Sequence, residues 1–253
     1  MHLAYLDNLG MSLWYLGAMR IQVEIKRTGR NKSVGFSVRW PDTLAVSAPP
    51  RMDKKTLESM VAERLPWAER RLAKLAADYQ RLGLPKEYAG GESFPYLGRE
   101  YPLTLMVTSG NTRPKCSLVE GRLVAVIPYA DEYDQSGLVR KALMKWYRQQ
   151  AKEDLTESVS RWAPVIGRTP EIVRIKSQRT RWGSCSRAGA VNLNWRLVML
   201  PPEVLAYVVV HEMCHLVEPN HSPRFWALVA QVIPDYKQRR TLLRRHSAYL
   251  DAF

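Results

Sequence analysis

Three of the five histidines in this 253-residue chain lie within eleven positions of one another. His211 and His215 are four residues apart, so a helix would place both imidazoles on one face, where they can bind the same metal ion. Glu212 lies beside His211 in an H-E-x-x-H pattern, in which the carboxylate takes a proton from a metal-bound water. These residues predict a zinc-dependent hydrolase with Glu212 as its catalytic general base.

Tetrahedral zinc requires a third protein ligand, and two residues compete for that position. Pro219 and Asn220 should end the helix and let the chain turn back, which brings His221 toward the ion. Glu218, seven residues after His211, would share the metal-binding face if the helix continued. We favour His221, because neutral imidazoles are common ligands of catalytic zinc. The sequence thus predicts one Zn²⁺ per chain, held by His211, His215 and His221.

The elements that must position these residues can also be predicted. Pro201 and Pro202 open the histidine-bearing helix, since proline suits the first helical position, and its apolar residues indicate burial. Ser222 and Pro223 predict the cap and first turn of the next helix. Upstream, alternating apolar residues predict strands at 172–176 and 190–198. The second strand could bind an extended peptide by strand addition if it lay at a sheet edge.

The region before residue 130 reads as a separate β-rich part with helical segments. Residues 21–48 predict a strand pair or a meander, and a second β region follows from residue 96 to residue 126. Between them, apolar residues at helical spacing follow Asp53, with Pro66 breaking or kinking the helix into a pair. A long helix is expected over 135–162.

We therefore predict an α+β fold: a zincin-like catalytic region with a metal-binding helix and a small sheet, plus an N-terminal β-rich subdomain with a helix pair. The predicted boundaries are 1–20 for an N-terminal extension, 21–130 for the β-rich subdomain and 131–253 for the catalytic region. The extension is too short and carries the wrong charges for a membrane span or a signal peptide.

Composition limits the compartment and the partners. The odd count of three cysteines, Cys116, Cys185 and Cys214, argues against a disulfide framework and favours a reducing cytoplasm. The net charge of +14 favours nucleotides, nucleic acids or acidic surfaces as partners, although basic residues are spread along most of the chain. No membrane association is expected.

Several motifs together resemble one known family. The sequences R-W-G-S-C-S at 181–186, L-N-W at 193–195, Y-V-V-V-H-E at 207–212 and N-H-S-P-R-F-W at 220–226 occur in that order. They closely resemble the YgjP-like family of predicted zinc metallopeptidases, relatives of the SprT proteases. The resemblance is densest from residue 172 to residue 235, and it implies zinc at the three histidines and the base at Glu212.

The substrate is less determined than the metal. Arg179, Arg181 and Arg224 are candidates for binding a carboxylate or phosphate of the substrate, because guanidinium groups bind oxyanions through two hydrogen bonds. Asn194, on the strand before the metal-binding helix, is a fourth candidate. A peptide substrate is favoured. The alternatives are a nucleoside-triphosphate phosphohydrolase, which the resemblance also allows, and a DNA-associated protease like SprT.

Overall fold

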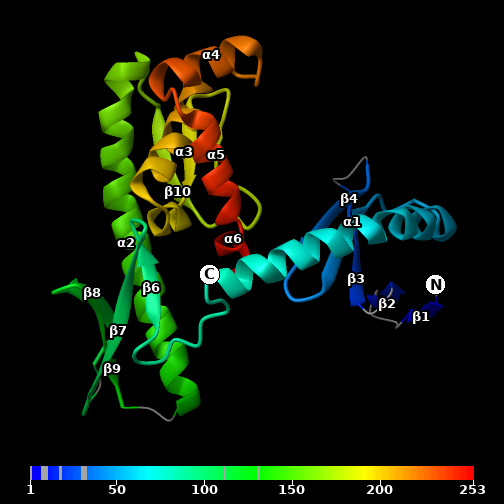
Figure 1. The fold of residues 1–253 in the computed structure, drawn as a ribbon, viewed down its shortest axis with the longest axis horizontal. Helices are drawn as coiled ribbons and strands as arrows, with labels where there is room; N and C mark the ends of the chain where they lie inside the picture. The colour runs from blue at the N-terminus through cyan, green and yellow to red at the C-terminus, as the bar shows by residue number, and fades with distance from the viewer. Residues whose placement is uncertain (1, 7–10, 17–18, 30–32, 111, 130–131) are drawn as a thin grey trace. The chain divides into compact units, whose positions relative to one another are not determined.

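The computed structural model describes the backbone of residues 2–6, 11–16, 19–29, 33–110, 112–129 and 132–253. The chain divides into two compact units, Met1–Leu84 and Pro85–Phe253, and the ribbon in Figure 1 runs through both. Strands and helices occur in each unit, so the fold is α+β, as predicted.

The first unit contains a five-stranded sheet in the order β1-β2-β3-β5-β4. Its strands are β1 (His2–Leu6), β2 (Met11–Leu16), β3 (Met19–Arg27), β4 (Gly35–Arg39) and β5 (Thr43–Ala48). Of the two arrangements expected here, a strand pair is present, since β4 and β5 pair antiparallel. A meander is not formed, because β5 lies between β3 and β4 and runs parallel to β3. The physical reason is burial: Leu44 and Val46 of β5 lie in the core of the unit, and a central position covers them best.

The predicted helix pair is a single helix, α1 (Lys54–Arg81), which continues through Pro66. Asp53 caps it, since its carboxylate accepts a hydrogen bond from the backbone N–H of Thr56 at 2.8 Å. Buried apolar residues continue on both sides of the proline, including Leu65 and Ala68, and pack into the core of the sheet. This continuous apolar stripe outweighs the local cost of proline inside a helix.

The second unit begins with a four-stranded sheet in the order β6-β7-β9-β8. Its strands are β6 (Ser93–Tyr96), β7 (Arg99–Thr108), β8 (Lys115–Val119) and β9 (Arg122–Pro128). This sheet packs on the long helix α2 (Glu132–Ile166), and the Tyr147 hydroxyl donates to the Pro95 carbonyl at 2.6 Å. The β region that the sequence analysis assigned to residues 21–130 is therefore split, because its second half covers the apolar side of α2.

The remainder of the second unit carries the predicted chemistry. A three-stranded sheet in the order β10-β12-β11 is formed by β10 (Ile172–Lys176), β11 (Gly183–Cys185) and β12 (Ala190–Asn194). The short 3-10 helix η1 (Trp195–Met199) leads into α3 (Pro202–Cys214). Helices α4 (Pro223–Val232), α5 (Tyr236–Arg245) and α6 (Tyr249–Ala252) follow, and α4 and α5 contact α3 (Figure 1).

The strand predicted over 190–198 differs from the structure in two ways. It ends at Asn194, whose side chain caps η1 by accepting from the Arg196 N–H at 3.2 Å. It is also the central strand of its sheet, paired with β10 on one side and β11 on the other. Its backbone is therefore already hydrogen-bonded on both sides. Of the two edge strands, β11 lies within the R-W-G-S-C-S motif at 181–186.

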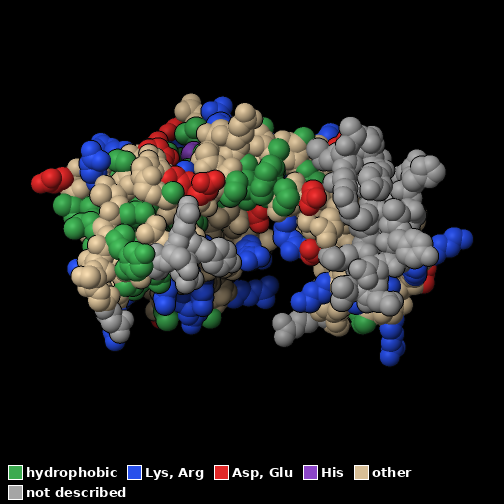
Figure 2. Space-filling view, turned by 90° about the horizontal axis from the view of Figure 1, so that it is seen from below, with side chains coloured by type: hydrophobic (Ala, Val, Ile, Leu, Met, Phe, Trp, Pro, Cys, Tyr) green, Lys and Arg blue, Asp and Glu red, His purple; other side chains and the backbone are tan. Residues whose placement is uncertain are grey.

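Among the described residues, no helix combines the length and the apolar composition needed to cross a bilayer. Lys and Arg side chains are spread over the surface in the space-filling view of Figure 2, in keeping with the net charge of +14.

Candidate metal centre

Helix α3 places the first two histidines next to each other. It is buried along most of its length, with Val208, Val209 and Val210 at most 3% exposed, so the backbone before His211 is fixed by packing. The His211 and His215 rings lie 5.1 Å apart in an edge-to-face arrangement. The spacing of four residues therefore brings the two imidazoles together, as the sequence predicts.

The third histidine joins them because the helix stops. Helix α3 ends at Cys214, and α4 begins at Pro223 with Ser222 as its cap, whose hydroxyl accepts from the Phe225 N–H at 3.2 Å. The intervening turn places the Nε2 atom of His221 3.1 Å from the Nε2 atom of His211. One ring nitrogen from each of His211, His215 and His221 lies within 4.8 Å of the others.

This donor set fits a zinc ion. The Nδ1 atom of His215 lies 3.1 Å from the Glu218 carbonyl oxygen, so an Nδ1–H there donates to that oxygen and leaves Nε2 with a free lone pair. Burial lowers the pKa of His211 to about 3 and also lowers the pKa of His215, which keeps both rings neutral, as metal ligands must be. Three imidazoles that converge on one ion leave a fourth tetrahedral position for water.

Glu218, the competing ligand, contributes to this site through its backbone. Its carbonyl oxygen holds His215, whereas its carboxylate is not among the three side chains that gather there in the described part of the chain. The end of α3 at Cys214 explains this, since the face shared by positions 211, 215 and 218 exists only on a continuous helix.

Aromatic rings hold the imidazoles in place. The Phe225 ring stacks on His215 at 4.4 Å, and the Trp226 ring stacks on His221 at 5.6 Å. Tyr236 stacks in turn on Trp226 at 5.3 Å, with the Arg240 guanidinium 5.2 Å from the Trp226 ring. Tyr236 and Arg240 could not be linked to the site from the sequence, because no spacing rule relates α5 to the metal-binding helix.

Glu212 lies beside the histidines and faces the edge strand β11. It is 8% exposed, and a Cβ atom built on Gly183 would lie 2.6 Å from its Cγ atom and 2.7 Å from Oε1. The glycine therefore makes room for the carboxylate. Burial raises the pKa of Glu212 to about 7, and the positive charge of Arg181 opposes this shift. The arrangement gives a carboxylate able to exchange a proton near neutral pH.

The four candidate substrate residues fall in different places. Arg181 is exposed, precedes β11 and acts electrostatically on Glu212, and Arg224 is exposed in the first turn of α4. Arg179 lines a separate pocket, described below. Asn194 is fully buried, and its amide donates to the carbonyls of Gln178 and Arg181 at 2.6 and 3.0 Å, so it supports the loop before β11.

One further group near the histidines was not singled out from the sequence. Tyr207, one turn before His211, has its ring 5.8 Å from the imidazole and is 3% exposed. Burial raises the pKa of its phenol to about 12, so the hydroxyl stays protonated at neutral pH and can donate a hydrogen bond. Its position four residues before His211 was the available signal, since both lie on one helix face.

A mixed α+β fold with three converging histidines beside an H-E-x-x-H glutamate is the arrangement expected of a metal-dependent hydrolase. A family model described as "YgjP-like, metallopeptidase domain" matches residues 32–246, so the chain belongs to the YgjP-like metallopeptidase family. Membership implies a catalytic metal, and this confirms the resemblance found in the sequence motifs. The basic composition had also suggested nucleotide or nucleic-acid partners, and the family match does not support them.

Other comparisons are sparse. No curated protein matches the chain. A solved structure, the crystal structure of the metallopeptidase zymogen of Pyrococcus abyssi abylysin, is 23% identical and covers 36% of this chain and 93% of its own, with a TM-score of 0.33. A likeness this loose carries no argument about the fold or the substrate of the chain.

Proposed function

We propose that the chain is a zinc peptidase in which His211, His215 and His221 hold one Zn²⁺ and Glu212 is the general base. The observation that carries this proposal is the convergence of three imidazole nitrogens within 4.8 Å, next to a carboxylate that is 8% exposed. A purely structural zinc site is closed by four protein ligands, whereas this one offers three ligands and a neighbouring base.

The reaction divides between the metal and the protein. A zinc ion at this site would lower the pKa of a coordinated water toward about 7 and polarise the substrate carbonyl. Glu212 accepts a proton from the attacking water and then donates it to the leaving amine nitrogen, so one side chain serves both proton transfers. Its raised pKa suits a group that must take up and release a proton near pH 7.

Negative charge develops on the carbonyl oxygen and requires a partner besides the metal. Tyr207 is the buried candidate, because its hydroxyl remains a donor at neutral pH. Arg181 and Arg224 are exposed candidates, more suited to binding an anionic group on the substrate than to the reacting oxygen.

The substrate we propose is an extended peptide that pairs with β11. This strand is hydrogen-bonded to β12 on one side and is the last strand of its sheet on the other, within the residues that the structure describes. Gly183 at its start adjoins Glu212, so a peptide backbone added at this edge would pass the base with no side chain between them. Strand addition is a common way for proteins to bind extended peptides.

The test is to incubate the zinc-loaded chain with an unfolded protein and, separately, with a nucleoside triphosphate, using Glu212→Gln as the control in both assays. We expect cleavage of the unfolded protein that Glu212→Gln abolishes. Triphosphate hydrolysis that depends on Glu212, is weakened by Arg181→Ala and occurs without proteolysis would overturn the peptidase assignment.

A further inference from the structure

A pocket of about 470 Å³ lies in the second unit, apart from the metal centre. Its walls come from α2, from the loop between β10 and β11, from η1 and from the last residues of the chain. The pocket lies beside η1, which precedes α3, whereas the histidines lie at and beyond the far end of α3. His211 is nine positions after Pro202, about 13 Å along the helix. The volume is within the range of small-molecule sites, roughly 300–1,000 Å³.

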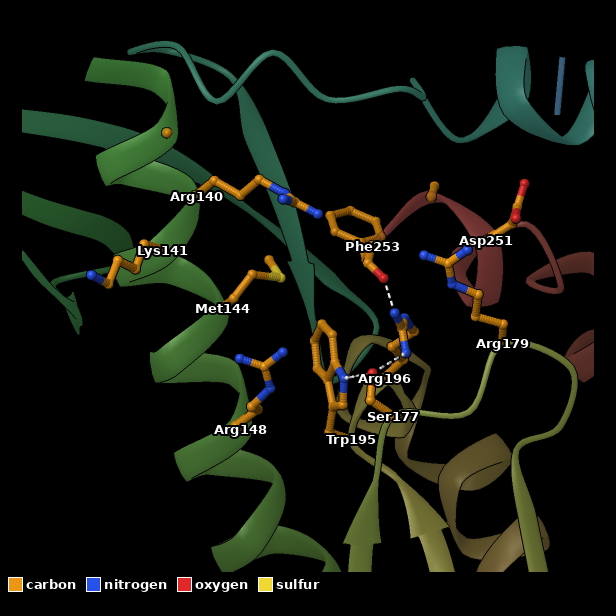
Figure 3. A pocket seen from close by; sticks show the side chains of 12 residues that line it. Arg140, Lys141, Met144, Arg148, Ser177, Arg179, Trp195, Arg196, Asp251 and Phe253 are labelled. Atoms are coloured by element: carbon orange, nitrogen blue, oxygen red, sulfur yellow. Dashed lines mark hydrogen bonds between the residues drawn. The ribbon is translucent and has the colours of Figure 1, made fainter. Parts of the chain in front are cut away.

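Arginines dominate this pocket. Figure 3 shows Arg140 extending from α2 toward Phe253 and Arg148 toward Trp195, with Arg196 and Arg179 on the other side of the pocket, whereas Lys141 points away. Among the described lining residues, Asp251 is the one acidic side chain, and Phe253, the last residue of the sequence, offers a backbone oxygen to Arg196. Four guanidinium groups therefore share a concave site with a single negative side chain.

Acidic side chains neutralise these arginines only in part. Asp251 acts electrostatically on Arg196, and the ion pairs of Arg39, Arg81, Arg161 and Arg239 lie elsewhere in the described structure. Arg148 and Arg196 instead lie over the Trp195 ring, at 5.5 and 4.6 Å from its centre. Burial, together with the charges of Arg148 and Arg179, lowers the pKa of Arg196 to about 10. The guanidinium groups are therefore close enough to repel one another, and Arg196 still stays protonated at neutral pH.

Arg196 is the feature that separates this pocket from an ordinary basic surface. It is 5% exposed, and its guanidinium donates to the Ser177 hydroxyl at 3.2 Å and to the Phe253 carbonyl (Figure 3). Its Nε–H is buried without a hydrogen-bond partner in the described structure. A buried cation with an unsatisfied donor is unfavourable unless a counter-ion compensates it.

We infer that this pocket is a binding site for a small phosphate-bearing anion with more than one negative charge. Arginine forks match phosphate oxygens through paired hydrogen bonds. Four guanidinium groups exceed Asp251 by three positive charges, or by two with a carboxylate on Phe253, the last residue of the sequence, so a ligand with more than one negative charge balances them. The pocket is larger than one inorganic ion needs, so the phosphate belongs to a larger molecule.

The lining favours a small molecule over a single strand of nucleic acid. Proteins that bind single strands stack bases on exposed aromatic rings. Here Trp195 is 1% exposed and covered by two arginines, and Phe253 is 5% exposed, so neither offers a free aromatic face.

Isothermal titration calorimetry with inorganic tripolyphosphate tests this inference on the full chain. We expect saturable binding at one site per chain. The double substitution Arg140→Gln with Arg179→Gln should weaken it at least tenfold, since it removes two of the four charges through exposed side chains. The matched control, Arg113→Gln with Arg168→Gln, removes the same charge from exposed positions that do not line the pocket and should stay within twofold of wild type.

Three further arms separate this site from its alternatives. His211→Ala should bind tripolyphosphate as the wild type does, because the ligand does not use the metal centre; loss of binding in that variant would overturn the inference. So would the absence of saturable binding, or equal weakening in the two double variants. Citrate bound as tightly as tripolyphosphate would contradict a phosphate ligand. If a 12-nucleotide single strand bound more tightly than tripolyphosphate and used the same arginines, the ligand would not be a small molecule.

Discussion

The contact between Gly183 and Glu212 allows a sharp test of the proposed base. Alanine at position 183 would place its Cβ atom 2.6 Å from Glu212 Cγ, about 1 Å closer than a van der Waals contact of roughly 3.5 Å allows. The backbone of Gly183 lies in a strand, which alanine can adopt, so the atoms that yield are those of the Glu212 side chain. A displacement of about 1 Å in a catalytic group lowers the rate about 100-fold, which corresponds to about 2.7 kcal/mol in the barrier.

We therefore expect Gly183→Ala to lower kcat/KM for peptide cleavage about 100-fold, with zinc content unchanged and the free energy of unfolding altered by less than about 1 kcal/mol. The measurement combines a proteolysis assay on an unfolded protein with metal analysis and urea unfolding. Gly90→Ala is the matched control, because its Cβ atom would meet only the Leu105 side chain at 3.5 Å. If Gly183→Ala kept activity within threefold of wild type, Glu212 would not be a general base whose position depends on Gly183.

Three other perturbations address the ligands, the electrostatics and the supporting loop. His221→Ala should abolish stoichiometric zinc binding in metal analysis while Glu218→Ala retains it, because the Glu218 carboxylate is not among the converging groups; the reverse result would exchange the two roles. Arg181→Gln should move the acid limb of the kcat/KM pH profile to higher pH, because it removes the charge that lowers the pKa of Glu212. Activity rises as that carboxyl loses its proton. An unmoved limb would show that Arg181 does not affect the pKa of the base. Asn194→Ala should lower the free energy of unfolding by about 1–3 kcal/mol in urea, because it leaves the partly buried carbonyls of Gln178 and Arg181 without these donors; an unchanged midpoint would contradict that supporting role.

The sequence was informative where chemistry follows from spacing along one element. Positions 211 and 215 share a helix face, and the proline at 219 indicated that the chain would leave the helix before His221. The structure brings these three side chains together. The helix caps could be predicted for the same reason, since the side chains of Asp53 and Ser222 accept hydrogen bonds from N–H groups three residues away.

The sequence was less informative where the outcome depends on packing between distant elements. Pro66 predicted a break or a kink that would divide α1 into two helices, but the apolar stripe on both sides of it packs into one core and keeps the helix continuous. No local pattern could show that β11, rather than β12, is the edge strand beside Glu212, because strand order is a tertiary property. The arginine pocket was equally hidden, since Arg140, Arg179 and Arg196 come from three separate segments.

The central claim is that Glu212 activates water beside a zinc ion held by three histidines. The most direct test is the rate of peptide cleavage by wild type and Glu212→Gln at equal measured zinc content. The amide keeps the shape of the side chain but cannot accept a proton at neutral pH, so we expect equal zinc and a loss of at least about 100-fold in kcat. Cleavage by the zinc-loaded Glu212→Gln variant within tenfold of wild type would contradict the account.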